Sequence, residues 1–71
     1  PQMREIQIQV TGMHCASCGL LIDDVMLDLQ GVATSVTDTR SGQCRVTASD
    51  DVSDASLLAA VVEAGYSGVI V

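Results

Sequence analysis

Residues 11–19, TGMHCASCG, place two cysteines, Cys15 and Cys18, three positions apart. The preceding residues 6–10 alternate between aliphatic residues and glutamine, which predicts a half-buried strand. Apolar side chains recur at helical spacing after the motif, which predicts a helix over residues 16–30. Both thiols should therefore lie in a loop and the first turn of a helix, where the positive end of the helix favours thiolate. Two thiolates about one helical turn apart can bind one soft metal ion.

The composition indicates a small globular domain with an aliphatic core. Of the 71 residues, 48% are hydrophobic, and Tyr66 is the one aromatic residue. The net charge of −6 argues against nucleic acid or an anionic membrane as a direct partner. No apolar run approaches the ~18 residues of a membrane span, so membrane attachment is expected only through a parent protein.

The cysteine count indicates the compartment. Three cysteines are an odd number, which disfavours a disulfide scaffold and favours metal or redox chemistry in a reducing compartment, the cytoplasm. The chain begins at Pro1 and ends at Val71 inside an apolar run. We therefore expect residues 1–71 to form a single domain cut from a longer protein.

The remaining pattern completes a βαββαβ order. Strands are predicted over residues 32–38, 43–48 and 68–71, the first of them with imperfect alternation. A second helix is expected to begin at the cap Ser53 and to end at Gly65. The order predicts an α+β, ferredoxin-like sandwich, with an antiparallel four-stranded sheet and two helices on one face.

The buried sides of both helices follow from the spacing of their apolar residues. The first helix should bury Cys18, Ile22, Val25, Met26 and Leu29, and the second Leu57, Ala60, Val61 and Ala64. Gly31 is expected to cap the first helix. Leu20 and Leu27 fall on its far side, where polar residues would be expected. On the strand over residues 43–48, the inward side should carry Cys44, Val46 and Ala48.

Three segments resemble the heavy-metal-associated domain family, which includes copper chaperones, N-terminal domains of metal-transporting P-type ATPases and mercury-resistance proteins. They are residues 12–18, GMHCASC, then Gly31-Val32, and Ala64-Gly65-Tyr66. The resemblance implies the βαββαβ fold, with Cys15 and Cys18 as ligands of Cu(I) or another soft ion. It also implies that Met13 packs beneath the loop and that Tyr66 lies near the site.

The function favoured by these residues is Cu(I) binding and transfer, in a copper-transporting P-type ATPase or a copper chaperone. Hg(II) binding in a mercury-resistance protein, or Zn(II) binding in a zinc ATPase, is the alternative. A structural zinc site needs four ligands, whereas the motif offers two adjacent thiolates. A dithiol oxidoreductase is disfavoured because the only proline is Pro1 and no aromatic residue flanks the cysteines. The domain itself is expected to catalyse nothing.

Other residues near the motif have two interpretations each. His14 is either a third ligand or an exposed spacer, and we favour the spacer. Cys44 is expected to be a small buried residue and not a ligand. Tyr66 either shields the site or simply packs at the end of the second helix.

The outer side of the first helix is a candidate docking surface. Asp23, Asp24 and Asp28 form either a solvated face or a docking face for a basic partner. Exposed Leu20 and Leu27 favour an interface, because apolar residues bordered by charge often mark one. The expected partners are a copper chaperone or ATPase domains, through transient, thiol-mediated docking. A metal-bridged dimer of this domain is chemically reasonable as well.

Overall fold

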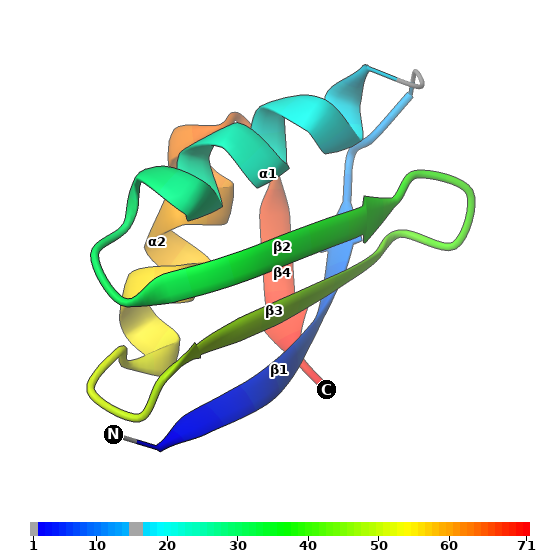
Figure 1. Cartoon of the computed structure of the whole chain (residues 1–71). Coiled ribbons are helices and arrows are strands. Elements are labelled where there is room, and N and C mark those ends of the chain that lie inside the picture. The colour runs from blue at the N-terminus through cyan, green and yellow to red at the C-terminus, as the bar shows by residue number, and fades with distance from the viewer. Residues whose placement is uncertain (1, 15–16) are drawn as a thin grey trace.

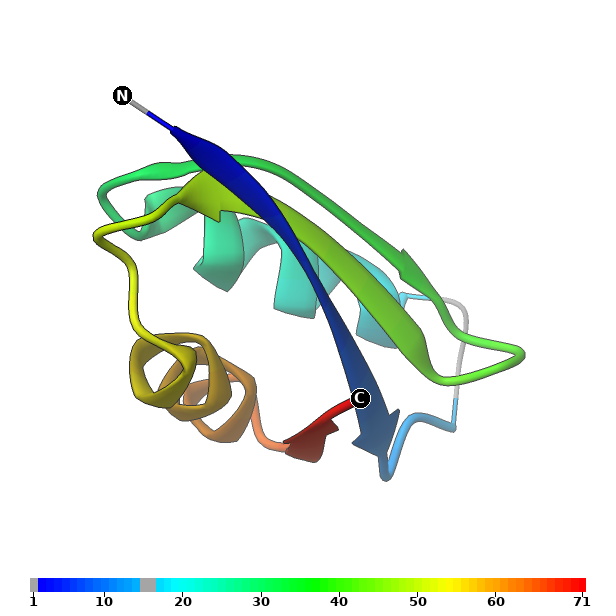
Figure 2. The same ribbon diagram turned by 90° about the horizontal axis from the view of Figure 1, so that it is seen from below.

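Six elements follow one another in the order β-α-β-β-α-β in a computed structural model that describes residues 2–14 and 17–71. They are β1 (Met3–Thr11), α1 (Cys18–Asp28), β2 (Val32–Asp38), β3 (Gln43–Ser49), α2 (Asp54–Glu63) and β4 (Ser67–Ile70). The strands form one sheet in the order β2-β3-β1-β4, with every neighbouring pair antiparallel (Figure 1). Both helices lie on the same face of this sheet (Figure 2), which confirms the predicted α+β ferredoxin-like sandwich. Neither of these described helices is long and apolar enough to cross a membrane.

The inner side of β1 lies at the centre of the core. Ile6, Ile8 and Val10 are buried and alternate with Gln7 and Gln9, which are only half-buried. Strand β1 lies between β3 and β4, and the inward residues of β3 are fully buried beside it. These residues are Cys44, Val46 and Ala48. The alternation predicted for both strands is therefore confirmed.

One side of α1 packs on the sheet as predicted, but the helix ends earlier than predicted. Its buried residues are Cys18, Gly19, Ile22 and Met26, and Val25 and Leu29 pack partly against the core. The helix ends at Asp28, and Leu29 already has an extended backbone, with φ −74° and ψ 132°. The prediction that Gly31 caps the helix is therefore wrong. With φ +96°, Gly31 instead turns the chain into β2.

Gly31 also makes room for Val52, a core residue that the sequence pattern did not reveal. A Cβ atom added at Gly31 would lie 2.7 Å from Val52 Cγ2, so only glycine fits here without a shift. Val52 is buried although it follows the polar residues 49–51. Its N–H donates to the carbonyl of Ser49 (3.0 Å), and this local turn brings the Val52 side chain inward. Apolar periodicity cannot detect a single inward residue in a turn.

Both ends of α2 are capped as predicted. At its start, Ser53 Oγ accepts a hydrogen bond from the N–H of Ser56 (3.1 Å). At its end, Gly65 has φ +101°, and its N–H donates to the carbonyl of Val62 (2.9 Å). The next N–H along the chain donates to the carbonyl of Val61 (3.1 Å). This pair of bonds is the usual ending of a helix on a left-handed glycine.

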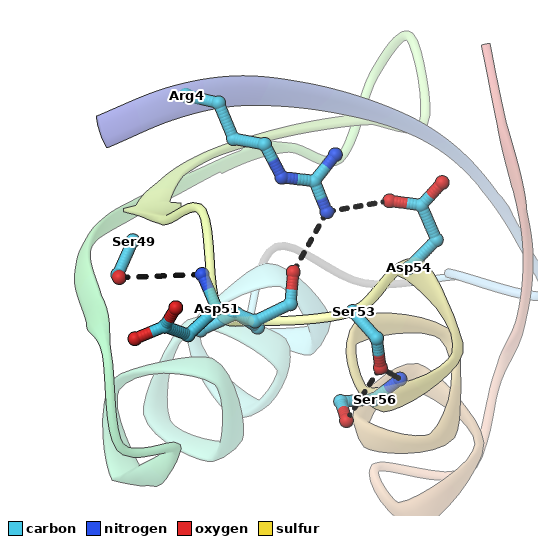
Figure 3. Close-up of polar contacts among 7 residues, drawn as sticks. Arg4, Ser49, Asp51, Ser53, Asp54 and Ser56 are labelled. Atoms are coloured by element: carbon cyan, nitrogen blue, oxygen red, sulfur yellow. Dashed lines mark hydrogen bonds and ion pairs between the residues drawn. The ribbon is translucent and has the colours of Figure 1, made fainter. Parts of the chain in front are cut away.

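An ion pair joins the start of α2 to β1 (Figure 3). Arg4 Nη2 donates to the carbonyl of Val52 (2.8 Å) and to Asp54 Oδ1 (2.7 Å). In the same loop, Ser49 Oγ accepts a weak hydrogen bond from the N–H of Asp51 (3.4 Å). Exposed ion pairs contribute at most about 1 kcal/mol. Arg4 therefore orients the loop before α2 more than it stabilises the fold.

The irregular pattern of β2 has a structural cause. This strand lies at the edge of the sheet and pairs with β3 alone. Its register shifts at a bulge between Val32 and Thr34. A bulge places two residues opposite one and interrupts the alternation of side chains. The imperfect alternation seen over residues 32–38 is the result.

Two Leu→Ala substitutions in helices test where the stability lies. Leu57 is fully buried in α2, whereas Leu20 on α1 is 66% exposed. Leu57→Ala should lower the free energy of unfolding by about 2–5 kcal/mol, because it removes buried methyl groups and leaves a cavity. Leu20→Ala should change it by less than about 0.5 kcal/mol. Urea titration of both variants measures this, and equal losses would contradict the assigned core.

Candidate metal centre

The predicted metal-binding motif begins where β1 ends. Gly12 follows the strand with φ +97°, a backbone conformation that favours glycine. Cys18 is the first residue of α1 and is only 6% exposed. Cys15, the other predicted ligand, lies outside the described residues. The pairing of Cys15 and Cys18 on one metal therefore stays a prediction, whereas the helical position predicted for Cys18 is confirmed.

The first turn of α1 provides a suitable environment for an anionic sulfur. The N–H groups of Leu20 and Leu21 both donate to the carbonyl of Ser17, at 3.1 and 3.3 Å, and these bonds start the helix. Cys18 thus lies at the positive end of an eleven-residue helix. That end favours a thiolate, the form of cysteine that binds metals. The donor chemistry at Cys18 fits a soft metal ion.

Met13 and Tyr66 both pack against the core near the start of the motif. Met13 is half-buried and packs against the hydrophobic core, which confirms its predicted packing role. Tyr66 is also half-buried against the core. A Cβ atom added at Gly12 would lie 3.5 Å from Tyr66 Cδ1, so the ring lies beside the start of the loop. The predicted proximity of Tyr66 to the motif is therefore confirmed at Gly12.

The side chain of His14 is exposed, as expected for a spacer. Within residues 2–14 and 17–71, no group of three or more His, Cys, Asp or Glu side chains could hold a metal ion. That His14 is a spacer and not a third ligand stays a prediction, because Cys15 lies outside these ranges.

Cys44 is a buried core residue, as predicted. It lies on the inward side of β3, and its Sγ is 3.8 Å from Ser35 Oγ. Burial raises the pKa of the Cys44 thiol above its ordinary value of 9.0. The hydroxyl groups of Thr37 and Ser35 oppose this increase in pKa, and the negative charge of Asp23 adds to it. The thiol of Cys44 is thus held in its neutral form, which does not bind metals.

Asp23 differs from what either interpretation of the acidic residues predicted. Its Oδ1 accepts hydrogen bonds from Ser35 Oγ and Thr37 Oγ, both at 2.7 Å. Asp23 is half-buried between α1 and β2, whereas Asp24 and Asp28 are exposed. The prediction that all three acids share an outer face is therefore wrong for Asp23. Ser35 and Thr37 are two residues apart in β2, so their hydroxyl groups share one face of the strand. This spacing was the signal in the sequence that could have indicated a partner for Asp23.

The leucines on the outer side of α1 are exposed as predicted. Leu20 is 66% exposed and Leu27 is 50% exposed. Leu21, beside Leu20 in the sequence, is 53% exposed as well. These three leucines with Asp24 and Asp28 are referred to below as the acidic leucine surface.

Comparison with known proteins agrees with this arrangement. A family model for the heavy-metal-associated domain matches residues 7–67. A copper binding domain from HMA7, a P-type ATPase, is 25% identical with a TM-score of 0.92, and the match covers 96% of this chain and 93% of that one. The yeast copper transporter domain CCC2A is 26% identical with a TM-score of 0.87, covering 96% and 94%. The N-terminal domain of PacS from Synechocystis PCC6803 is 26% identical with a TM-score of 0.86, covering 96% and 97%.

The pKa of Cys44 predicts how stability depends on alkaline pH. A raised pKa means that the folded state holds the Cys44 proton more tightly than the unfolded chain does. The resulting stability is complete below pH 9.0 and is lost as the pH rises through the folded-state pKa. The free energy of unfolding of the reduced protein should therefore fall above about pH 9, and Cys44→Ala should show a smaller fall. Urea titrations between neutral and alkaline pH measure this, and identical profiles would contradict it.

Proposed function

The chain belongs to the heavy-metal-associated domain family, and we propose that it binds Cu(I) through Cys15 and Cys18 and passes the ion to a partner. The observation that carries this proposal is the position of Cys18 at the positive end of α1, three residues after a second cysteine in the sequence. Members of this family are metal-binding modules and catalyse no reaction themselves. Copper is therefore the cargo of this domain.

The choice of Cu(I) follows from the donor set. Two adjacent thiolates suit a soft ion that accepts few ligands, whereas a structural zinc site takes four. The similar domain from HMA7 is described as copper binding, and CCC2A as a copper transporter domain that exists in a Cu(I)-loaded state. Both descriptions support copper for this chain.

A Cu(I) ion with only two ligands can accept a third, and this allows it to be transferred to a partner. A thiolate of the partner adds to the bound Cu(I), and one sulfur of this chain then leaves as a thiolate. A second exchange completes the transfer, so the ion is never released into water. The oxidation state of copper does not change, and each sulfur stays anionic throughout.

The acidic leucine surface supports a particular kind of partner. Asp24 and Asp28 are exposed between exposed leucines, and the whole chain carries a net charge of −6. Two copies of this surface would repel each other, whereas a basic surface would be attracted. We therefore infer that a basic copper chaperone or ATPase domain docks here. A dimer that shares one Cu(I) is the alternative arrangement, and the sedimentation of copper-loaded protein distinguishes the two.

The parent protein sets the wider role. We propose that residues 1–71 form one delivery module of a copper-transporting P-type ATPase or act as a copper chaperone. A reducing compartment such as the cytoplasm would keep both thiols available. Reading the parent sequence for membrane helices with an ion-path cysteine tests this assignment directly.

Removing both proposed ligands should separate binding from folding. Equimolar Cu(I) added to the reduced protein should shift NMR signals mainly within residues 12–19 and raise the melting temperature, because the ligand binds only the folded state. Cys15→Ala with Cys18→Ala should stay folded and lose both effects. The control, Cys44→Ala, should keep them, because Cys44 lies in the core. Copper binding that survives in the double variant would contradict the proposed ligands.

Substitutions on the acidic leucine surface test docking. Leu20→Ser with Leu27→Ser should slow copper transfer from a copper-loaded basic chaperone by about tenfold, equivalent to about 1.4 kcal/mol of docking free energy. Their effect on stability should be small, because both side chains are at least half exposed. Val36→Ser is the matched control, since Val36 is 67% exposed on β2. An unchanged transfer rate in the leucine variant would rule out this docking surface.

A further inference from the structure

The first turn of α1 lies unusually close to β2. A Cβ atom added at Gly19 would lie 3.0 Å from Thr39 Cγ2 and 3.2 Å from the carbonyl oxygen of Thr37. Contacts that short require the neighbouring atoms to move, so glycine allows the helix to rest against the end of the strand. Gly19 directly follows Cys18. The backbone beside the proposed metal ligand is therefore in direct contact with β2.

A second attachment lies one helical turn further along. Asp23 Oδ1 accepts hydrogen bonds from Ser35 Oγ and Thr37 Oγ, both at 2.7 Å, and these two bonds are referred to as the Asp23 clamp. Hydrogen bonds to a carboxylate are stronger than those between neutral groups. Thr37 takes part in both attachments, because its carbonyl lies under Gly19 and its hydroxyl binds Asp23. One residue of β2 thus contacts both points of the helix.

The rest of α1 does not need the clamp. Its later turns are held by Ile22 and Met26, which are fully buried in the core. The first turn buries only Cys18 and Gly19. Strand β2, on the other side, is an edge strand that pairs with β3 alone. Loss of the clamp would weaken the contact between the start of the helix and the end of the strand while the core stayed packed.

We propose that Asp23 is a positioning residue for Cys18: the Asp23 clamp and the close contact at Gly19 fix the first turn of α1 on β2, and thereby fix the Cys18 sulfur for metal binding. The inference rests on the proposed function, which makes Cys18 a ligand. It assigns part of the metal affinity to hydroxyl groups of β2 that lie outside the loop. A binding site whose ligand is already in place loses less conformational entropy on binding.

Substitution of Asp23 tests the proposal with two measurements. Asp23→Ala should raise the Cu(I) dissociation constant, measured by competition with a chromophoric chelator, by about tenfold, which is less than the full contribution of the two hydrogen bonds to a charged group that it removes. In the metal-free protein, amide hydrogen exchange at Leu20 and Leu21 should accelerate by a similar factor relative to β1 and β3. Asp23→Asn keeps an acceptor oxygen, so its dissociation constant and its exchange rates should lie close to the wild-type values.

The control removes the same charge elsewhere. Glu63 is exposed at the end of α2, outside the loop and outside the acidic leucine surface. Glu63→Ala should change the dissociation constant and the exchange at Leu20 by less than about twofold. From the other side of the contact, Ser35→Ala with Thr37→Val should reproduce the effects of Asp23→Ala. Combining all three substitutions should add little further, because they remove the same two bonds.

Two results would overturn the proposal. In the first, Asp23→Ala accelerates exchange equally at all protected amides, which indicates only a general loss of stability. In the second, the exchange changes locally but the Cu(I) dissociation constant matches that of Glu63→Ala. Failure of the proposed function would look different, because the wild-type protein itself would then not bind Cu(I), while the local exchange at Leu20 would still report the clamp.

Discussion

Burial of the inner side of β1 beneath two helices is the interaction on which the rest of the structure depends. Ile8 is fully buried at the centre of the sheet, and Ile22 of α1 and Leu57 of α2 are equally buried in the same core. An aliphatic core with a single tyrosine in the chain has little surplus stability at this size. The proposed metal site lies between β1 and α1, next to this core, with Cys18 as the first residue of α1.

The elements on either side of the proposed site define its two ends. The strand fixes where the loop begins, at Gly12, and the helix fixes where it ends, at Cys18. Met13 and Tyr66 are only partly buried, and both pack against the edge of the core. Cys44 shows the opposite case, since the same side chain placed inside the core is kept neutral by burial. Cys18 is also nearly buried, but it lies at the positive end of α1, and this position favours Cys18 over Cys44 as a metal ligand.

The sequence predicted what regular spacing determines and missed what single contacts determine. The alternation in β1 and the glycine that ends α2 have a local cause, so the pattern reported them correctly. The burial of Val52 goes with one close approach to Gly31, which periodicity does not record, and the end of α1 goes with the extended backbone of Leu29. The pattern showed that Asp23 avoids the core, but a polar residue can face water or face hydroxyl groups on a neighbouring strand. Only the packing of α1 on β2 decides between these.

Charge links the site to the choice of partner. One Cu(I) ion and two thiolates together carry a single negative charge, so the proposed binding would leave an anionic centre on a chain that is already acidic. The positive end of α1 stabilises that centre, but its effect falls off within the first turn. Beyond it, exposed Asp24 and Asp28 extend the negative potential along the helix. An incoming thiolate is itself anionic, so a basic surface around it would assist its approach, and salt should weaken that attraction.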